Sequence, residues 1–583
     1  MAITDDAPIL EANLRQVSGN QRRLRTSLLQ QRLSCCTVTF ITVVSILAWA
    51  QMSWGQSTCP RFPSGSTVKD PPRLFSSNGR LVVDLTYQTE VDDKGLTRFC
   101  FQTPDGKQSP TLYVNPGDEL VVGVKNLVPE DAPGLPQMKM GSMRGMEISS
   151  ALGTAPLVCG SATMTAASVN VHYHGTNVSP TCHSDEVIRT MINSGESFTY
   201  RIKFPVNEPP GLYWYHPHIH GITEAAVQGG ATGLIVVGGF ENVQPLVAGL
   251  KQRFLVVRDN PVPDGTGADS EPAWDLSLNY VPVPYPDYPP AVIEIGAGEK
   301  QFWRLANTAA GTILDLELRY DGVPQPLTLV GLDGVPTGSQ DGTRLGKAVS
   351  MKHLLIPPAG RAEFIVAGPS TQVKGAVLLV RRVDTGPDGD NDPTRPLAVL
   401  KTAVKENADR LAKMPVFHGL TGHQRFEGLA EAKATVHRKL YFSENNADSQ
   451  FFITVDGQEP TLFDPNNPPA IVTQQGSVED WTIENRSLEN HEFHIHQIHF
   501  LLLAENGVAV PRKRQQFLDM VDVPYWTGKG PYPSVTVRMD FRGPDVGDFV
   551  YHCHILEHED NGMMAIIRVL PRKQPSASDG GQK

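Results

Sequence analysis

The stretch Gly547–His558 reads GDFVYHCHILEH and runs on into the apolar MMAIIRVL. Its hydrophobic residues predict a buried β-strand, yet it contains three histidines and one cysteine, which are strong metal ligands. Successive side chains of a strand point to opposite faces. His552 and His554 therefore share one face and Cys553 lies on the other. This strand offers ligands to two separate metal sites.

Histidines elsewhere in the chain repeat this spacing. Of the 17 histidines, 13 fall in four short segments, HYHGTNVSPTCH (172–183), HPHIH (216–220), HEFHIHQIH (491–499) and HCHILEH (552–558). Each segment contains two histidines that are two residues apart and so share a strand face. These pairs are His172 and His174, His216 and His218, His494 and His496, and His552 and His554. Eight imidazoles that converge from two parts of the chain predict a site for more than one metal ion.

A second metal site is predicted on the face of Cys553. His491 lies three residues before the next histidine pair, and this odd spacing turns it to that other face. His558 lies four residues beyond the last pair, so the strand must end there and the chain must turn back. Met563 follows five residues later. Two imidazoles, a thiolate and a thioether are the ligand set of a blue copper site.

Zinc binding and nucleophilic catalysis fit the histidines less well than copper does. A structural zinc site uses four ligands at finger-like spacing, and one cysteine among so many histidines does not supply it. A nucleophilic cysteine needs one base and one orienting group, which leaves most of the histidines without a purpose. Histidines of an ordinary core would not come in four matched pairs. Three histidines break the pairing, and we expect them to support ligands or to lie at the surface: His183, His220 and His499.

The rest of the chain has the pattern of an all-β protein. Past residue 60, short runs rich in Val, Ile, Leu, Thr and Tyr are broken by Gly, Pro, Asn and Asp, which predicts β-sandwiches or barrels. One form recurs near residues 113, 293 and 472: a strand, a Gly-containing turn with an acid, a strand and an Asn. Such a repeat predicts three copies of one module. The length of 583 residues allows roughly three or four domains.

Composition changes along the chain suggest the module limits. The Asp/Gly/Pro-rich Asp384–Pro396 is interpreted as a linker between the second and third modules. The stretch Lys401–Met414 predicts one short helix. We expect a leader followed by three modules, at residues 1–56, 57–240, 241–395 and 396–583.

The first module carries an insertion at about residues 127–168. It contains four methionines, Met138, Met140, Met143 and Met146. The insertion is either a mobile loop or a trap for Cu(I), because thioether sulfur is a soft ligand that Cu(I) prefers.

The first fifty residues differ from the rest. A basic stretch, NQRRLRTSLLQQR, leads into an apolar run from Thr37 to Ala50, which is shorter than the ~20 residues that a membrane span needs. Ala48 and Ala50 form an A-x-A cleavage pattern. We interpret a secretory signal peptide and an exported protein, periplasmic or extracellular. The alternative is an uncleaved membrane anchor.

The cysteines agree with export. An even set in the N-terminal third is compatible with two disulfides in an oxidising compartment, in any of three pairings. Its members are Cys59, Cys100, Cys159 and Cys182.

The net charge of -11 argues against nucleic acid as a partner. We expect a monomer that acts on small molecules.

With these motifs the chain resembles the multicopper oxidases, and among them the bacterial laccase-like enzymes. The four histidine segments follow the order of that family, and the resemblance covers roughly residues 70–570. It implies three cupredoxin domains and four copper ions per chain. A mononuclear type 1 copper would lie in the last domain, and a trinuclear cluster of one type 2 and two type 3 coppers between the first and the last.

The resemblance also implies a role for each ligand. His491, Cys553 and His558 match the type 1 ligands, with Met563 axial, and His172 and His494 would bind the type 2 copper. The type 3 pair would be bound by His174, His216, His218, His496, His552 and His554.

Two acids match residues with family roles. Asp185 corresponds to the acid beside the type 2 site, and Glu559 to the carboxylate that supplies protons to bound dioxygen in bacterial members. Either acid could instead only orient a ligand histidine. Glu492 in HEFH and Pro217 in HPHIH depart from the commoner family residues, and neither departure replaces a ligand.

The expected activity follows from this resemblance. It implies an oxidase that couples four one-electron oxidations of a small donor, a phenol or an aromatic amine, to the reduction of O2 to two waters. An alternative is a metallo-oxidase that converts Cu(I) to Cu(II) for copper tolerance, which the methionine-rich insertion motivates. A third possibility is a copper-storing cupredoxin protein without turnover.

Overall fold

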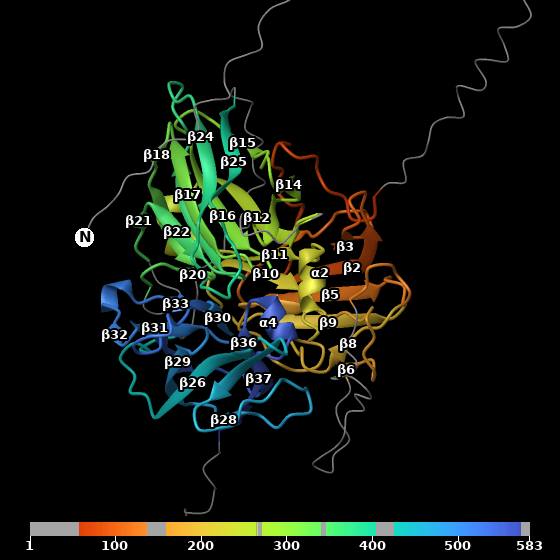
Figure 1. The fold of residues 1–583 in the computed structure, drawn as a ribbon, viewed down its shortest axis with the longest axis vertical. Coiled ribbons are helices and arrows are strands. Elements are labelled where there is room, and N and C mark those ends of the chain that lie inside the picture. Colours follow the sequence, from red (N-terminus) through yellow and green to blue (C-terminus); the bar gives the residue numbers. More distant parts are fainter. Residues whose placement is uncertain are drawn as a thin grey trace, which may run out of the picture. The chain divides into compact units, whose positions relative to one another are not determined.

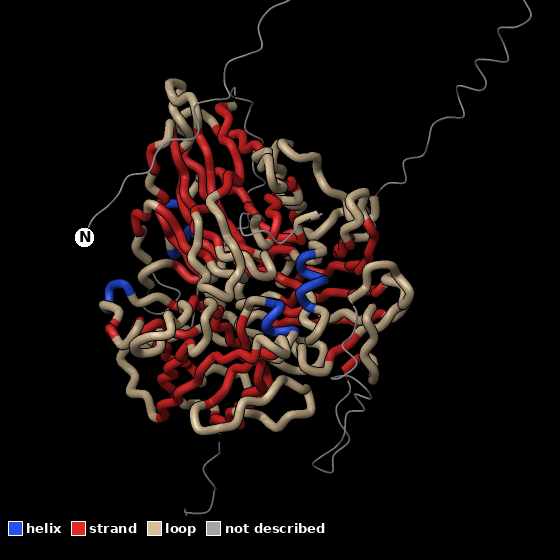
Figure 2. The backbone as a smooth tube through the Cα atoms, in the orientation of Figure 1, coloured by secondary structure: helices blue, strands red, loops and turns tan. Residues whose placement is uncertain are grey.

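The computed structural model describes residues 57–136, 159–263, 265, 271–339, 346–403 and 425–572. Three features of the sequence lie outside these residues: the expected leader, the four methionines of the insertion and most of the expected helix after Lys401. Strands dominate and helices are few and short, as Figure 2 shows. Among the described residues, no helix is long and apolar enough to cross a membrane. The fold class is therefore all-β, as the sequence predicts.

The first module consists of two facing sheets around one core, drawn in red to yellow in Figure 1. One sheet has four strands in the order β3-β2-β5-β9, which are β2 (Arg80–Val91), β3 (Thr97–Gln102), β5 (Glu119–Asn126) and β9 (Ser197–Lys203). The other has the order β1-β4-β11-β10-β7, which are β1 (Arg73–Phe75), β4 (Thr111–Val114), β7 (His172–His174), β10 (Gly211–His216) and β11 (Gly233–Val237). A small pair, β6 (Cys159–Gly160) and β8 (Thr190–Met191), lies beside them. Both disulfides are in this module, Cys59–Cys100 and Cys159–Cys182.

The second module repeats this sandwich with larger sheets. The first has the order β14-β13-β12-β16-β23-β19-β20, with β21 paired to β19. Its strands are β12 (Lys251–Pro261), β13 (Trp274–Leu278), β14 (Val281–Val283), β16 (Lys300–Asn307), β19 (Leu327–Leu332), β20 (Val335–Pro336), β21 (Val349–Met351) and β23 (Arg361–Ala367). The second has the order β15-β25-β24-β17-β18, with β22 paired to β17. Its strands are β15 (Ala291–Ile295), β17 (Leu314–Tyr320), β18 (Val323–Pro324), β22 (His353–Ile356), β24 (Ala376–Arg381) and β25 (Arg395–Thr402).

The third module, in cyan to blue in Figure 1, carries the two C-terminal histidine segments. Its first sheet has the order β27-β26-β29-β35-β31-β32, with β33 paired to β31. These strands are β26 (Val436–Asn445), β27 (Gln450–Val455), β29 (Val478–Asn485), β31 (Phe500–Glu505), β32 (Val508–Ala509), β33 (Phe517–Leu518) and β35 (Ser534–Asp540). The second sheet has the order β28-β37-β36-β30-β34, which are β28 (Ile471–Gln474), β30 (His491–Ile495), β34 (Met520–Val523), β36 (Gly547–Cys553) and β37 (Met564–Leu570).

The interpretation of Asp384–Pro396 as a linker between modules is wrong. This stretch joins β24 to β25 within one sheet of the second module, where Val380 pairs with Arg395 and Val377 with Val399. The side chains of β25 also enter the core of that module. The second module therefore extends to Thr402 rather than ending at residue 395. Gly, Pro and Asp are as favourable in a hairpin connection as in a linker, so composition did not distinguish the two.

Each sequence repeat forms a corner that takes the chain from one sheet to the facing sheet: β4 to β5, β15 to β16 and β28 to β29. The asparagine that ends each repeat is fully buried, and its amide donates to backbone carbonyls of neighbouring loops. Asn126 donates to Ala167 and Ile192, Asn307 to Thr312, Ile356 and Pro357, and Asn485 to Glu489 and Val523. A buried carbonyl without a partner costs roughly 1–3 kcal/mol, which explains why an amide recurs there.

The few helices lie in connections. They are α2 (Thr223–Gln228), α3 (Phe240–Val243) and α4 (Leu556–Asp560), with 3₁₀ turns at Pro245–Val247 and Arg512–Arg514. Helix α4 follows directly on β36 and lies beside α2 (Figure 1). Asp560 ties the two together, because its carboxylate accepts from the backbone N–H groups of Gly221, Thr223 and Glu224.

Candidate metal centres

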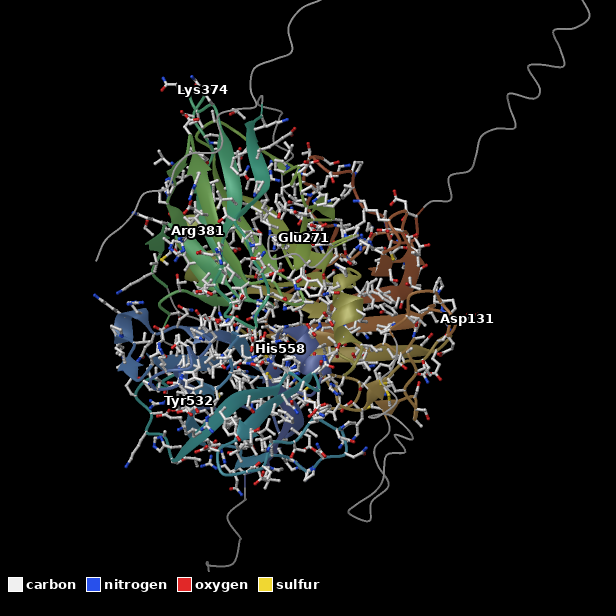
Figure 3. All side chains as sticks on the ribbon, in the orientation of Figure 1. Asp131, Glu271, Lys374, Arg381, Tyr532 and His558 are labelled. Atoms are coloured by element: carbon white, nitrogen blue, oxygen red, sulfur yellow. A yellow bond between two sulfur atoms is a disulfide. The ribbon has the colours of Figure 1, made fainter. Side chains whose placement is uncertain are left out.

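The Cys553 face of β36 forms a three-ligand site with His491 from β30 and His558 from α4. The Nδ1 atoms of the two histidines lie 3.1 Å apart, and Cys553 Sγ lies 3.6 Å from that of His491 and 3.7 Å from that of His558. Cys553 and His491 are fully buried and His558 is 4 % exposed. Figure 3 labels His558, the ligand that α4 supplies. Three ligand atoms that face one common point at these spacings match a trigonal copper site.

The outer nitrogens of both rings are fixed by hydrogen bonds. Ser487 donates its hydroxyl proton to Asn485, so it accepts from His491 Nε2 at 2.7 Å. His558 Nε2 donates to Glu489 at 3.2 Å. Each Nε2 thus carries a proton, and each Nδ1 faces the sulfur of Cys553. Outer hydrogen bonds of this kind set the tautomer of metal-binding histidines.

The thiol of Cys553 is prepared for metal binding. Burial raises the pKa of Cys553, but hydrogen bonds from His491 and His558 outweigh burial and bring the pKa to about 6. The backbone N–H of Glu492 also donates to Sγ, at 3.4 Å. Since the thiolate is the metal-binding form, these contacts favour ligation.

Met563, the predicted fourth ligand, lies next to this site. It is fully buried in the same apolar cluster as Cys553. Its carbonyl accepts from Cys553 N at 3.1 Å, and its N–H donates to the carbonyl of His558 at 2.9 Å. The turn through α4 therefore brings the methionine back between the two ligands, as the sequence requires.

The other face of β36 contributes to a cluster of eight buried imidazoles. They come from β7, the end of β10, β30 and β36 and from the residues that follow these strands: His172, His174, His216, His218, His494, His496, His552 and His554. Strand pairing aligns them, because His172 is opposite His216 and His494 is opposite His552. Four segments far apart in sequence thus converge on one point between the first and third modules.

The rings form one packed cluster, in which His172 stacks on His496 at 3.8 Å and His174 on His494 at 4.1 Å, and it includes the two triads and the pair that the family resemblance implies. In one triad, His174, His216 and His554 have ring centres 5.0 to 5.8 Å apart. In the other, His218, His496 and His552 have ring centres 4.8 to 5.3 Å apart. The remaining rings, His172 and His494, are 6.2 Å apart. Each group can supply two or three nitrogen ligands to one ion.

Unpartnered nitrogens show that this cluster fits metal ions. Nε2 of His172, His216 and His494 is buried without a hydrogen-bond partner among the described residues. His216 and His494 each donate Nδ1–H to a backbone carbonyl, of Pro217 and of Asp519, so Nε2 presents a lone pair. Burial lowers the pKa of His216 to about 3, which keeps its imidazole neutral. Buried neutral imidazoles with free lone pairs are suited to copper or zinc, and the Cys553 site selects copper.

One stretch of backbone joins the two centres. Cys553 lies between His552 and His554, and its carbonyl accepts from His552 Nδ1 at 2.8 Å. On the neighbouring strand β30, Phe493 lies opposite Cys553 and His494 lies opposite His552. The two metal sites are therefore separated by a single strand pair.

Asp185, one of the two predicted acids, contacts the cluster directly. Its Oδ1 lies 3.0 Å from His172 Nδ1 and accepts from Tyr173 N–H, and its Oδ2 accepts from Gln497 at 2.6 Å. Burial raises the pKa of Asp185 to about 7. Gln497, which lies in the histidine segment 491–499 but was not predicted as a site residue, links this carboxylate to the third module.

Glu559, the other predicted acid, faces the second triad. Its Oε1 lies 4.0 Å from His218 Nδ1, and neither carboxylate oxygen has a hydrogen-bond partner among the described residues. Burial, together with the neighbouring Asp560, raises the pKa of Glu559 well above its ordinary value. A buried acid in this position can hold a proton close to the cluster.

A charged pair between the second and third modules supports the histidine cluster, and no sequence motif revealed it. Arg361 and Asp519 are both fully buried and form a two-point ion pair. His499, which breaks the histidine pairing, lies beside them and donates Nε2–H to the carbonyl of Asp333 at 2.8 Å. His183 is exposed and bonded to the Thr199 carbonyl, and His220 packs on Phe463.

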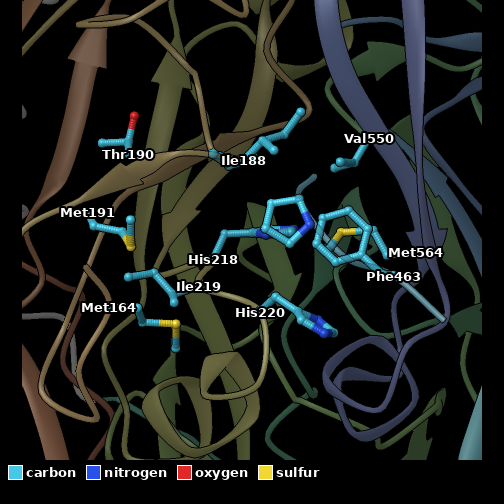
Figure 4. Close-up of a pocket in the computed structure, with 12 residues that line it drawn as sticks. Met164, Ile188, Thr190, Met191, His218, Ile219, His220, Phe463, Val550 and Met564 are labelled. Carbon is cyan, nitrogen blue, oxygen red and sulfur yellow. The ribbon is translucent and has the colours of Figure 1, made fainter. Parts of the chain in front are cut away.

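Cavities adjoin both centres. Beside His558 lies a cavity of about 330 Å³, whose lining includes four acids, Asp388, Asp390, Glu489 and Glu557. On the cluster side, His218 forms part of a small cavity of about 30 Å³ with mostly apolar walls (Figure 4). That volume holds about one molecule of the size of water.

Comparison with known proteins agrees with these centres. Family models described as "Multicopper oxidase" match residues 141–239 and 433–573, which contain all twelve predicted ligands. "Multicopper oxidase mco" of Staphylococcus haemolyticus is 25% identical over 417 residues, which covers 68% of this chain and 76% of that protein.

Solved structures show the same fold. A multicopper oxidase from Campylobacter jejuni, described as a metallo-oxidase, has a TM-score of 0.61 and 22% identity, and the match covers 88% of this chain and 96% of that one. The laccase-like CueO of Ochrobactrum sp., described with oxidase activity towards lignin model compounds and lignosulfonate, has a TM-score of 0.56 and 21% identity, covering 86% of this chain and 100% of that one.

Proposed function

We infer the function from one premise: this chain belongs to the multicopper oxidase family, and its reaction is a copper-dependent oxidation. We propose that it couples four one-electron oxidations of a small donor to the reduction of O2 to two waters. The single observation that supports this best is the strand pair β30/β36. With the residues that follow these strands, it supplies His491, Cys553 and His558 on one side and four histidines of the eight-histidine cluster on the other.

We propose one mononuclear and three clustered coppers. His491, Cys553, His558 and Met563 would bind the type 1 ion, and His172 and His494 the type 2 ion. The two triads would each bind one ion of the type 3 pair. When bound, these ions supply the one-electron redox chemistry and the site where dioxygen is reduced.

The protein's own residues supply position, connection and protons. Cys553 joins the two centres through its own backbone, so electrons need not cross a gap between modules. Asp185 holds His172 in one tautomer, and its second oxygen is fixed by Gln497. Glu559, whose carboxyl has no fixed partner among the described residues, is placed to deliver protons near His218. Four protons are needed for each O2, which is why a buried acid belongs there.

The donor would bind in the cavity beside His558. Its volume of about 330 Å³ suits a single aromatic ring with substituents. We propose phenols and aromatic amines as donors, and the four acids in its lining favour amines that carry a positive charge. Glu489 accepts a hydrogen bond from His558 Nε2. A donor molecule that contacts Glu489 would therefore lie close to His558, a proposed type 1 ligand.

A second candidate is oxidation of metal ions such as Cu(I). The acidic lining of the same cavity favours this candidate, since carboxylates attract metal cations. Carboxylates that bind the oxidised metal ion more tightly than the reduced one also lower its reduction potential. The related Campylobacter jejuni structure is described as a metallo-oxidase.

Oxygen consumption with matched donors tests the proposal. The copper-loaded chain would be supplied in turn with 2,6-dimethoxyphenol, an N,N-dimethyl-phenylenediamine and Cu(I). Turnover of the organic donors supports the first candidate, and turnover of Cu(I) alone supports the second. A further variant without residues 135–147 asks whether the methionines of the insertion serve Cu(I). Failure to consume oxygen with every donor would reject both.

We also propose that the protein is exported and acts as a monomer. Two disulfides in the first module suit an oxidising compartment, periplasmic or extracellular. A monomer would suffice, because both metal centres are formed within one chain.

A further inference from the structure

A positively charged cavity lies away from the metal centres, between the first and second modules. It has a volume of about 320 Å³ and is lined by residues 60–62 and 69–72, the loop before β4, the start of β11, and β12 with the turn that follows β13. Four cations and one acid line it: Arg61, Lys69, Lys107, Arg258 and Asp70. The chain as a whole carries a net charge of -11, so this concentration of positive charge is local.

Among the described residues, the exposed Lys69 and two less exposed cations, Arg61 and Arg258, have no carboxylate partner. Arg258 is 4 % exposed and Arg61 is half-buried, and within the described residues neither forms an ion pair. In the part of the chain that the structure describes, Arg258 donates only to Thr232, through Nε at 2.7 Å and Nη2 at 2.8 Å, and its Nη1 has no hydrogen-bond partner. Arg61 donates to the carbonyls of Cys59 and Gly229.

Both guanidinium groups stack on the same ring. Their central carbons lie 3.9 Å (Arg258) and 4.5 Å (Arg61) from the ring centre of Tyr280. The ring compensates part of the charge, because a cation over an aromatic face gains roughly 0.5–2 kcal/mol. Two like charges beside one ring nevertheless repel each other. Burial lowers the pKa of Arg61 to about 9, with further repulsion from Arg98 and Arg258.

The acid in the lining does not relieve these charges. Asp70 is already bound to Arg73 at 2.6 Å, and its other oxygen accepts from the backbone of Phe254. Lys107 pairs with Asp105 at the rim, where both are exposed. The buried end of the cavity therefore keeps an excess of positive charge, which is costly in a protein interior unless an anion accompanies it.

We propose that this cavity binds a small aromatic carboxylate. The carboxylate would compensate Arg61 and Arg258, and guanidinium groups bind carboxylates with strong charge-assisted hydrogen bonds. The body of the ligand would lie against the apolar walls, which include Phe62, Pro72 and Leu234. A volume of about 320 Å³ is the size of a site for one such ring. The site is independent of the metal centres and of the proposed oxidase reaction.

Calorimetric titration of the copper-loaded full chain with benzoate tests the proposal, with benzamide as the uncharged analogue. We expect one site for benzoate and at least tenfold weaker binding of benzamide. Arg258→Met should weaken benzoate at least tenfold. Arg253→Met is the matched control, because Arg253 lies on the same strand β12, is also buried and does not line the cavity. This control should bind benzoate as the wild type does.

A surface variant keeps the test valid if Arg258→Met does not fold. Lys107→Glu changes only an exposed rim residue and should also weaken benzoate several-fold. In crystals soaked with 4-iodobenzoate, the anomalous signal of iodine should lie in the cavity beside Tyr280. Absence of benzoate binding, equal binding of benzamide, or undiminished binding in both variants would overturn the proposal.

Discussion

Arg361 of the second module holds Asp519 of the third in a fully buried two-point ion pair, in which Nη1 lies 2.7 Å from Oδ1 and Nη2 donates to Oδ2. Asp519 in turn contacts the histidine cluster twice. Its carbonyl accepts from His494 Nδ1 at 2.8 Å, and its carboxylate lies 3.7 Å from His174 Nε2. A module that supplies no ligand thus helps to position two of them.

Arg361→Met should change the type 2 copper site. The substitution leaves Asp519 buried and uncompensated, which costs roughly 3–5 kcal/mol and frees the carbonyl that orients His494. We expect a lower melting temperature, altered type 2 hyperfine splitting in the EPR spectrum and loss of part of the clustered copper. Arg361→Lys should restore part of each.

A matched control separates this effect from general destabilisation. Arg304 and Glu363 form a comparable buried pair in the same module, at 2.6 Å, and contact no ligand histidine. Arg304→Met should lower the melting temperature and leave the EPR spectrum unchanged. Identical spectra for Arg361→Met and the wild type would show that the Arg361 pair serves the fold alone.

Met563→Leu should raise the reduction potential of the type 1 copper. A thioether in the axial position stabilises the oxidised ion, and leucine cannot replace that contact. We expect a rise of roughly 60 mV, which is a tenfold change in a one-electron equilibrium. Redox titration of the blue absorption measures it. An unchanged potential would remove Met563 from the ligand set.

Glu559→Gln should slow oxygen reduction without slowing electron entry. The amide keeps the shape of the side chain and loses the proton, so kcat should fall on the order of 10²-fold. Anaerobic stopped-flow reduction of the blue absorption by the donor should proceed at the wild-type rate. If both rates fall together, or neither falls, Glu559 does not supply protons.

Removing charge from the cavity beside His558 should discriminate between donors. Asp388→Asn with Asp390→Asn removes two of its four acids without touching a ligand. KM should rise several-fold for a cationic amine or Cu(I) and change little for a neutral phenol, and the contrast should shrink as salt is added. The double variant Asp93→Asn with Asp131→Asn, which changes two exposed acids of the first module, is the control. Equal effects on all donors would place the donor elsewhere.

The sequence predicts which histidines come together because this information is local. Alternation along a strand is enough to separate Cys553 from His552 and His554, and β36 has that geometry. The buried asparagine that ends each repeat explains why the repeat is visible in the sequence, since its amide donates to loop carbonyls in all three modules.

The rest depends on contacts between distant residues. Arg361 and Asp519 are 158 residues apart, and neither belongs to a recognisable motif. Arg61, Arg258 and Tyr280 meet only after two modules have packed. The stretch Asp384–Pro396 has a composition that fits a hairpin loop and a linker equally, and only the pairing of β24 with β25 decides between them.

Copper counting on the wild type and on Cys553→Ser tests most directly whether one strand serves two metal centres. We expect four coppers per purified, copper-loaded chain, and three in Cys553→Ser, with the blue absorption lost and the type 2 EPR signal retained. A wild-type chain with far fewer than four coppers, or a Cys553→Ser chain that stays blue, would contradict this arrangement.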